Sequence, residues 1–273
     1  MRQILGGLAV LLALGWPMLG QKRAMAGPGG EREARQFPTG STVAQLPWTL
    51  APITAASVET EPASSAAGAK VSVGELQIPA AALKELRMFQ EKFTAGKLED
   101  ASKHAEKAIR IYPQLGGAHY NLGLCYARLN RYDKAVVELQ TAAELDARLV
   151  PPRVTLAELF LIQGKYSEGE AAARSALDLD PVNRVARYFL ARNLVSAGHE
   201  TAEAIELLEK SREEFPGARL SLANVYLKKN ATDDAVKELR AYLQQPNAPQ
   251  KDRIACVVEK LRQANDTSTC AAK

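Results

Sequence analysis

The second half of the chain repeats itself, and this repetition limits the possible folds more than any other feature of the sequence. Leu122, Leu156 and Leu190 are each 34 residues apart, and Leu222 follows after 32. Self-similarity at a period of about 20 to 50 residues is typical of solenoids, in which each unit buries its apolar face only against its neighbours. The period therefore predicts a stack of similar units.

Other residue types recur in step with these leucines. Small residues return at intervals of 34, 34, 35 and 31 residues, at Ala101, Ala135, Gly169, Ala204 and Ala235. Turn-forming residues do so as well, at Gly96, Asn130, Gly164 and Gly198. Ala, Leu, Glu, Lys and Arg supply most of the remaining positions, and these are strong helix formers. Each unit is therefore predicted to be two helices joined by a tight turn.

A period of 34 with these residues resembles the tetratricopeptide repeat (TPR) family, whose pattern has Leu-Gly, then an aromatic residue, a turn Gly, an Ala and a terminal Pro. The best-matching unit carries Leu122-Gly123, Tyr126 and Ala135, whereas Gly169 stands where Ala is usual. The resemblance covers roughly residues 82–247. It implies an all-α fold, a right-handed α-solenoid of about five TPR hairpins, with repeats near 82–115, 116–149, 150–183, 184–215 and 216–247.

The residues after Pro249 have the spacing of one more helix. Ile254, Val257, Val258 and Leu261 recur at helical intervals. We expect a capping helix within 248–265, which covers the last repeat, and a tail over 266–273. Cys256 and Cys270 pair in a disulfide if the compartment is oxidising, and are two free thiols otherwise. The sequence leaves both alternatives open.

The N-terminus has the features of an export signal. An apolar stretch from Ile4 to Leu19 follows Arg2 and precedes Ala24-Met25-Ala26, a pattern that signal peptidase recognises. We expect residues 1–26 to be a cleaved signal peptide and the protein to be periplasmic or extracellular. The alternative is an uncleaved segment that anchors the chain to a membrane.

The composition changes to Pro, Ala, Gly and Ser over residues 27–80. Such a segment buries too little apolar surface to offset its ordering entropy, so we expect a mostly disordered linker. Two places are expected to differ. Leu46-Pro47-Trp48 is a candidate docking segment, and residues 71–78 are expected to lie extended against the first repeat.

Charge and motifs exclude several classes of function. Formal net charge is +4, and three of these charges lie in the expected signal peptide, so no basic surface for nucleic acid remains. The motifs of nucleotide-binding loops, serine hydrolases and zinc proteases are not found. The three histidines fall on different repeats without ligand spacing. We therefore predict a non-enzymatic protein without metal or cofactor.

The family resemblance also places a binding surface. Members of this family bind their partners on the concave face, which is formed mainly by the first helix of each hairpin. The corresponding groove positions here are Gln90, Tyr120, Leu124, Arg128, Glu158, Leu161, Tyr188, Arg192 and Asn224. The aliphatic members have packing between helices as an alternative role. The mixed charges from Glu206 to Glu214 are interpreted as a solvated face on a second helix.

The expected function is a protein-interaction scaffold that holds a segment of a partner protein in this groove. Chaperone-binding members grip a C-terminal carboxylate with Lys and Asn in the first repeat, but this chain has Leu86 and Gln90 there, so that clamp is not expected. One alternative is an accessory of envelope assembly or secretion that is anchored through a retained N-terminus. Another is a glycan-binding accessory.

Overall fold

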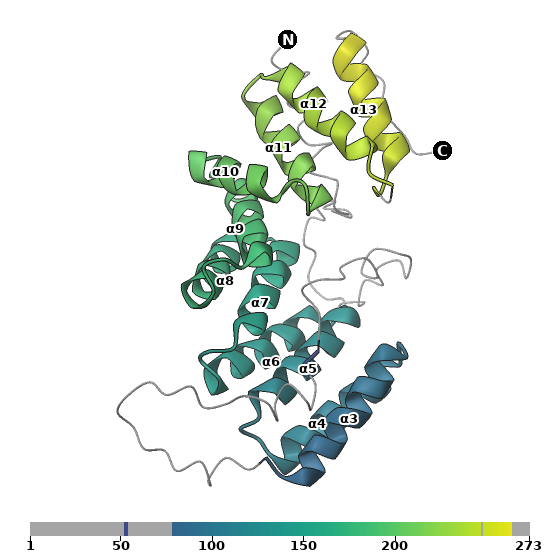
Figure 1. The fold of residues 1–273 in the computed structure, drawn as a ribbon, viewed down its shortest axis with the longest axis vertical. Helices are drawn as coiled ribbons and strands as arrows, with labels where there is room; N and C mark the ends of the chain where they lie inside the picture. Colours follow the sequence, from purple (N-terminus) through teal and green to yellow (C-terminus); the bar gives the residue numbers. More distant parts are fainter. Residues whose placement is uncertain (1–51, 54–77, 247, 264–273) are drawn as a thin grey trace, which may run out of the picture. The chain divides into compact units, whose positions relative to one another are not determined.

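The computed structural model describes residues 52–53, 78–246 and 248–263, and the structural statements below concern these ranges. Helices α3 to α13 make up the described secondary structure (Figure 1). They are α3 (Ala80–Thr94), α4 (Leu98–Ile111), α5 (Gly116–Arg128), α6 (Tyr132–Leu145), α7 (Val150–Gln163), α8 (Tyr166–Leu179), α9 (Arg184–Ser196), α10 (Ala202–Ser211), α11 (Pro216–Lys228), α12 (Thr232–Leu243) and α13 (Lys251–Gln263). The predicted all-α fold of helical hairpins is confirmed.

The expected signal peptide and most of the expected linker lie outside the described residues. Among the residues that are described, no helix has the length and apolar character needed to cross a membrane. The chain divides into two compact units, with the boundary after Asn193 in α9. We describe each unit by itself.

In the first unit, α3 pairs with α4, α5 with α6, and α7 with α8. A glycine sets the close approach of α5 and α6. A Cβ at Gly123 would lie 2.8 Å from Leu139 Cγ of α6, which is closer than real Cβ contacts allow. Ala135 of α6 is fully buried nearby. The small residues of the repeat pattern therefore mark the contact between the two helices of a hairpin, as the sequence indicates.

The turn inside each hairpin requires one residue in the left-handed region. Gly96, Gly164 and Gly198 have φ values of 73°, 74° and 87°, and Asn130 and Asn230 take the same place with φ of 58° and 59°. Glycine has no Cβ that disfavours this conformation, and asparagine tolerates it better than most residues. The fifth repeat thus keeps the turn with Asn230, a residue that the sequence pattern did not single out.

Ile78 lies just before α3 and packs against the first repeat, beside a cluster of Leu86, Ala108, Leu115 and Ala118. This contact concerns Ile78 alone, so the expected extended course of residues 71–78 stays a prediction. The other residues of that segment lie outside the described ranges.

The second unit ends in a capping helix. α12 contacts both α11 and α13, and the three lie side by side in Figure 1. Ile254, Val257 and Val258 of α13 are buried in one cluster with Leu239 and Tyr242 of α12. Cys256 on α13 is disulfide-bonded. Cys270 lies outside the described residues, so the pairing of these two cysteines stays a prediction.

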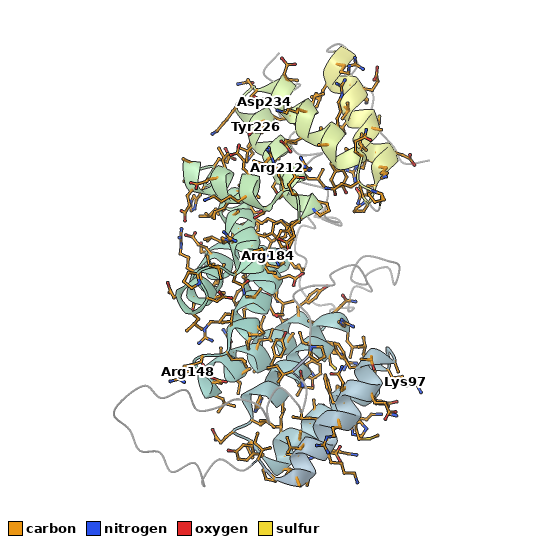
Figure 2. The ribbon with its side chains drawn as sticks, in the orientation of Figure 1. Lys97, Arg148, Arg184, Arg212, Tyr226 and Asp234 are labelled. Atoms are coloured by element: carbon orange, nitrogen blue, oxygen red, sulfur yellow. The ribbon has the colours of Figure 1, made fainter. Side chains whose placement is uncertain are left out.

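A buried ionic network joins three helices of the second unit. Glu238 of α12 is 3% exposed and accepts hydrogen bonds at 2.9 Å from Arg212, which follows α10, and from Arg219 of α11. Figure 2 labels Arg212 at this end of α10. Arg212 thus differs from the other Glu206–Glu214 charges: 36% of its side chain is exposed, but it also pairs with the buried Glu238. Glu206 and Lys210 do form an exposed pair.

Candidate functional site

The side chain of Asn121 on α5 holds the backbone of Ile53. The Ile53 N–H donates to Asn121 Oδ1 at 2.9 Å, and Asn121 Nδ2 donates to the Ile53 carbonyl oxygen at 2.8 Å. Asn121 is fully buried. One residue of an antiparallel pair exchanges the same two hydrogen bonds with its partner strand. The amide of Asn121 therefore pairs with a backbone as a neighbouring strand would.

The Ile53 side chain packs on an apolar surface beside this amide. This surface, formed by Gly117 and the core cluster, is called the seat below. Ile53 packs against the core cluster of the first unit, which includes Tyr120, Leu122 and Leu124. Gly117 lies one turn before Asn121 on α5, and a Cβ there would be 3.1 Å from Ile53 Cγ2. A larger residue at position 117 would press on the isoleucine. The site thus combines a backbone-reading amide with room for a β-branched side chain.

Polar residues connect α5 to α7 next to this seat. Tyr120 is fully buried and is hydrogen-bonded to Thr155 of α7. Burial raises the pKa of Tyr120, and the nearby negative charge of Glu158 adds to this effect. The phenol is therefore protonated at neutral pH. It therefore does not act as a base.

Arg128 lies at the end of the same helix and covers an aromatic ring. Its guanidinium carbon is 4.3 Å from the ring centroid of Phe93 in α3. A cation at this distance from a ring face is attracted by the ring quadrupole. Arg128 is half-buried, so it links α5 to α3 and still has exposed surface.

The predicted groove residues fall into two groups. Tyr120, Leu124, Glu158 and Tyr188 are buried, at 0%, 0%, 2% and 8% exposure. Leu124 lies in the core cluster, which fits the packing role that the sequence left open. The half-buried group is Gln90, Arg128, Leu161, Arg192 and Asn224. Partner binding by any of these residues stays a prediction.

Two groove amides have carbonyl oxygens that are buried and accept no hydrogen bond from the described part of the chain. They are Gln90 Oε1 on α3 and Asn224 Oδ1 on α11. An unsatisfied buried acceptor costs about 1–3 kcal/mol, and a bound N–H group would remove this cost. Gln90 lies in the same unit as Asn121.

On α9, Arg192 and Tyr188 interact with each other. The Arg192 guanidinium donates to Tyr188 Oη at 3.3 Å and lies 5.5 Å from the ring centroid. Tyr188 also packs on Phe189, with ring centroids 5.2 Å apart. This pair gives α9 a half-buried cation held in place by an aromatic ring.

Asn121 itself was not among the predicted groove residues. A signal for it exists in the sequence, because an asparagine stands between Tyr120 and Leu122 in an otherwise apolar and small-residue helix. Asparagine favours caps and turns over helix interiors, so this position is unusual without a side-chain partner. Of the docking candidates in the linker, Leu46-Pro47-Trp48 lies outside the described residues, and the described contact is made by Ile53.

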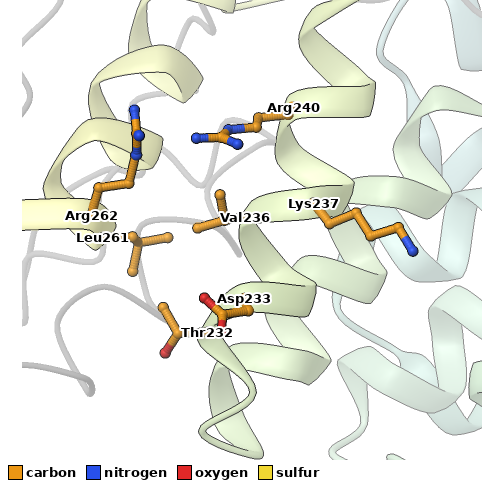
Figure 3. A pocket seen from close by; sticks show the side chains of 7 residues that line it. All are labelled: Thr232, Asp233, Val236, Lys237, Arg240, Leu261 and Arg262. Atoms are coloured by element: carbon orange, nitrogen blue, oxygen red, sulfur yellow. The ribbon is translucent and has the colours of Figure 1, made fainter.

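The second unit contains a separate cavity of about 570 Å³ between α12 and α13. Figure 3 shows Arg240 and Arg262 extending into it from the two helices. Lys237 and Asp233 also line it, so cations prevail. Across the described ranges, no three His, Cys, Asp or Glu side chains gather as metal ligands would.

Comparisons with known proteins agree with this architecture. The tetratricopeptide repeat model matches residues 86–151, 154–217 and 190–251. Stress-induced-phosphoprotein 1 of Caenorhabditis elegans is 24% identical over 125 residues, which are 46% of this chain and 39% of that protein. The chain thus spans about two fifths of that relative.

Solved structures show the same fold at low sequence identity. PilF of Pseudomonas aeruginosa superposes with a TM-score of 0.58 at 20% identity, over 67% of this chain and 84% of that one. MamA of Desulfovibrio magneticus has a TM-score of 0.56 at 15% identity, over 70% of this chain and 100% of that one. YrrB, described as a TPR protein with an unusual peptide-binding site, has a TM-score of 0.55 at 16% identity, over 67% of this chain and 92% of that one. With the family model matching most of the helical region, this chain belongs to the tetratricopeptide repeat family.

Proposed function

We propose that this chain is a non-enzymatic scaffold that binds an extended segment of a partner protein along the first helices of its repeats. TPR solenoids present extended surfaces to protein or peptide partners. The observation that carries the proposal is the pairing of Asn121 with the backbone N–H and C=O of Ile53. A surface that holds one extended residue in this way is suited to hold an extended peptide.

The same geometry limits the conformation of the partner. Both backbone groups of the bound residue pair with Asn121, so neither is available for a helix hydrogen bond. In the interior of a helix, both groups are already used within the helix. The bound part of the partner is therefore extended, and recognition resembles the addition of a strand, with main-chain bonds for affinity and a side-chain seat for specificity.

Selection of peptides from a random library on the immobilised full chain tests this proposal. Selected peptides are labelled, and their affinity is measured by fluorescence polarisation for Ile53→Asp, in which Ile53 no longer fills the site, and for the same variant that also carries Asn121→Ala or Gln140→Ala. Gln140 is an exposed amide on the second helix α6 and is the matched control. We expect only Asn121→Ala to weaken binding, by about tenfold for two lost backbone hydrogen bonds. Equal binding to all three proteins would show that the site lies elsewhere.

We further propose that the protein works outside the cytoplasm, as its N-terminal sequence indicates. The disulfide at Cys256 supports this proposal, because disulfides persist in oxidising compartments and are rare in the cytosol. N-terminal sequencing of the protein from its native host tests it. A start at Gly27 is expected, and recovery of an intact Met1 form in the membrane fraction would favour the anchored alternative.

A further inference from the structure

We infer that Pro52–Ile53 is the chain's own ligand for the Asn121 site, so that a partner binds by displacing it with an extended segment that carries a β-branched apolar residue. This inference rests on the proposed function, because it identifies what fills the groove before a partner arrives. Ile53 and Asn121 are 68 residues apart in sequence and are joined by two hydrogen bonds. The occupant is thus a defined residue of this chain.

Burial explains why the site needs an occupant. Asn121 is fully buried with Ile53 in place, and both of its polar atoms are used by that one residue. A buried donor or acceptor without a partner costs about 1–3 kcal/mol. If the segment leaves, water or another backbone must satisfy the same two atoms. An incoming partner replaces both hydrogen bonds when it offers an N–H and a C=O from one extended residue.

The seat also selects the side chain. Ile53 Cγ2 fills the space above Gly117, and the rest of its side chain packs on the apolar cluster of the first unit. A charged residue here would lose its hydration without a partner of opposite charge. The preceding Pro52 has a fixed φ and no N–H, so it favours the extended form without competing for the amide. These features point to a partner segment with Ile or Val at the central position.

The segment is tethered to its own site. Residues 54–77 lead from Ile53 to Ile78, which packs against the first repeat. Tethers of this kind give effective concentrations on the order of 1 mM. When tethered and free copies of one sequence compete for one site, the apparent Kd of the free copy equals its intrinsic Kd plus that effective concentration. The intact chain therefore rejects weak ligands, and only a partner that binds more tightly opens the site.

A disulfide trap tests where the segment lies. A Cβ at Gly117 would be 3.6 Å from Ile53 Cβ, inside the range of about 3.5–4.5 Å that disulfides span. We expect the Ile53→Cys/Gly117→Cys chain to form an intramolecular disulfide under mild oxidation, as seen by mass spectrometry of non-reduced fragments. The control pair is Ile53→Cys/Val137→Cys, since Val137 is an exposed residue of α6. Burial raises the pKa of Cys125 to about 12, so this thiol does not compete.

Two outcomes of the disulfide trap would overturn the inference. Equal crosslinking of the two cysteine pairs would show that the segment has no preferred place and would overturn the inference. A disulfide between two chains in place of one within a chain would assign the segment to a second copy, and this also contradicts occupation in cis.

Displacement is measured with a labelled peptide of residues 46–60 of this chain. We expect it to bind full-length Ile53→Asp at least about tenfold more tightly than the wild type, because the variant's own segment no longer competes. The same peptide with aspartate at the isoleucine position should bind neither.

Failure of the inference and failure of the proposed function give different results. Equal affinity of the peptide for wild type and Ile53→Asp would overturn the inference. If library-selected peptides still require Asn121 in that case, the scaffold function stands without occupation in cis. If Asn121→Ala changes the binding of no peptide, the proposed function fails as well.

Discussion

Asn193 and Gly169 share one space between α9 and α8: a Cβ at Gly169 would lie 2.1 Å from Asn193 Oδ1. Asn193 is fully buried, and its Nδ2 donates to the carbonyl oxygens of Ala157 at 3.1 Å and Phe189 at 2.8 Å. Gly169 stands where the family pattern has Ala. The departure is explained by the polar side chain that lies against it.

Gly169→Ala is therefore expected to destabilise the protein although Ala is the usual residue. Forcing a methyl into this contact costs on the order of 1–3 kcal/mol of unfolding free energy, more than the gain of about 1 kcal/mol in helix propensity. In the background of Asn193→Ala the same change should be neutral or stabilising. Urea denaturation of the four proteins in a double-mutant cycle measures the coupling. Additive effects, or a more stable Gly169→Ala protein, would contradict this explanation.

Ala135 and Lys134 are neighbours in sequence but lie in opposite environments. Ala135 is fully buried between α6 and α5, whereas Lys134 is exposed. Ala135→Phe should lower the unfolding free energy by at least about 1–3 kcal/mol through overpacking, and Lys134→Ala should change it by less than about 0.5 kcal/mol. Thermal melts of the two variants rank them. The reverse order would mean that the repeat register is shifted by at least one residue.

His119 gives the stability of the first unit a pH dependence. Its Nδ1 lies 2.8 Å from Glu138 Oε2, and its Nε2 lies 3.1 Å from the Pro113 carbonyl oxygen. The hydrogen bond to Glu138 is the main cause that raises the pKa of His119 above its ordinary value. Protonated His119 therefore stabilises the folded protein. This contribution is complete below the unfolded-state pKa of about 6.5 and is lost as pH rises through the folded-state pKa.

The prediction for His119 follows from that sign. The difference in unfolding free energy between wild type and His119→Gln should be largest near pH 5.5 and should shrink toward about pH 8.5. Urea melts at several pH values measure it. A difference that stays constant or grows with pH would show that the imidazolium is not favoured in the folded state.

In the ionic network of the second unit, Arg219 has one buried and one exposed partner. Arg219 bonds to Glu238, whose side chain is 4% exposed, and to Glu213, whose side chain is 78% exposed. Glu238→Ala removes the buried partner of Arg219 and leaves only the exposed Glu213 to pair with it, so it should cost about 3–5 kcal/mol, whereas Glu213→Ala should cost about 0–1 kcal/mol. Chemical denaturation compares the two. Similar losses would mean that burial does not control the strength of this network.

Features that depend on local backbone conformation were readable from the sequence. The turn positions at Gly96, Asn130, Gly164 and Gly198 follow from the period, because each hairpin needs one left-handed residue at the same place. The contact of Ile53 with Asn121 could not be predicted from the sequence. It joins positions 68 residues apart through backbone atoms, and a backbone contact leaves little trace in side-chain composition.

The candidate docking segment Leu46-Pro47-Trp48 lies outside the described residues and stays a prediction. The described contact of Ile53 depends on an amide and on the space above a glycine, which side-chain composition does not indicate. The role of Arg212 was missed for a related reason. Its buried partner Glu238 lies 26 residues away on another helix, so the charges nearest in sequence indicated a solvated face.

The last prediction concerns Tyr188 and Arg192 on α9, which the family resemblance places in the groove. Tyr188 is 8% exposed and packs on Phe189, while Arg192 is half-buried and lies against the Tyr188 ring. Tyr and Arg are enriched among residues that dominate interfaces. We expect both Arg192→Ala and Tyr188→Ala to weaken the binding of library-selected peptides, and only Tyr188→Ala to lower the melting temperature, because only the tyrosine is part of the packed core.

The control for this pair is Glu206→Ala, which changes an exposed ion pair on the second helix α10. Peptide affinity and melting temperature should both stay at the wild-type level. Positive charge at Arg192 also implies that peptides with an acidic residue are enriched in the selection, and that Arg192→Glu removes this enrichment. If both α9 variants bind as the wild type does and Glu206→Ala abolishes binding, the partner contacts the second helices, and the groove assignment for α9 is wrong.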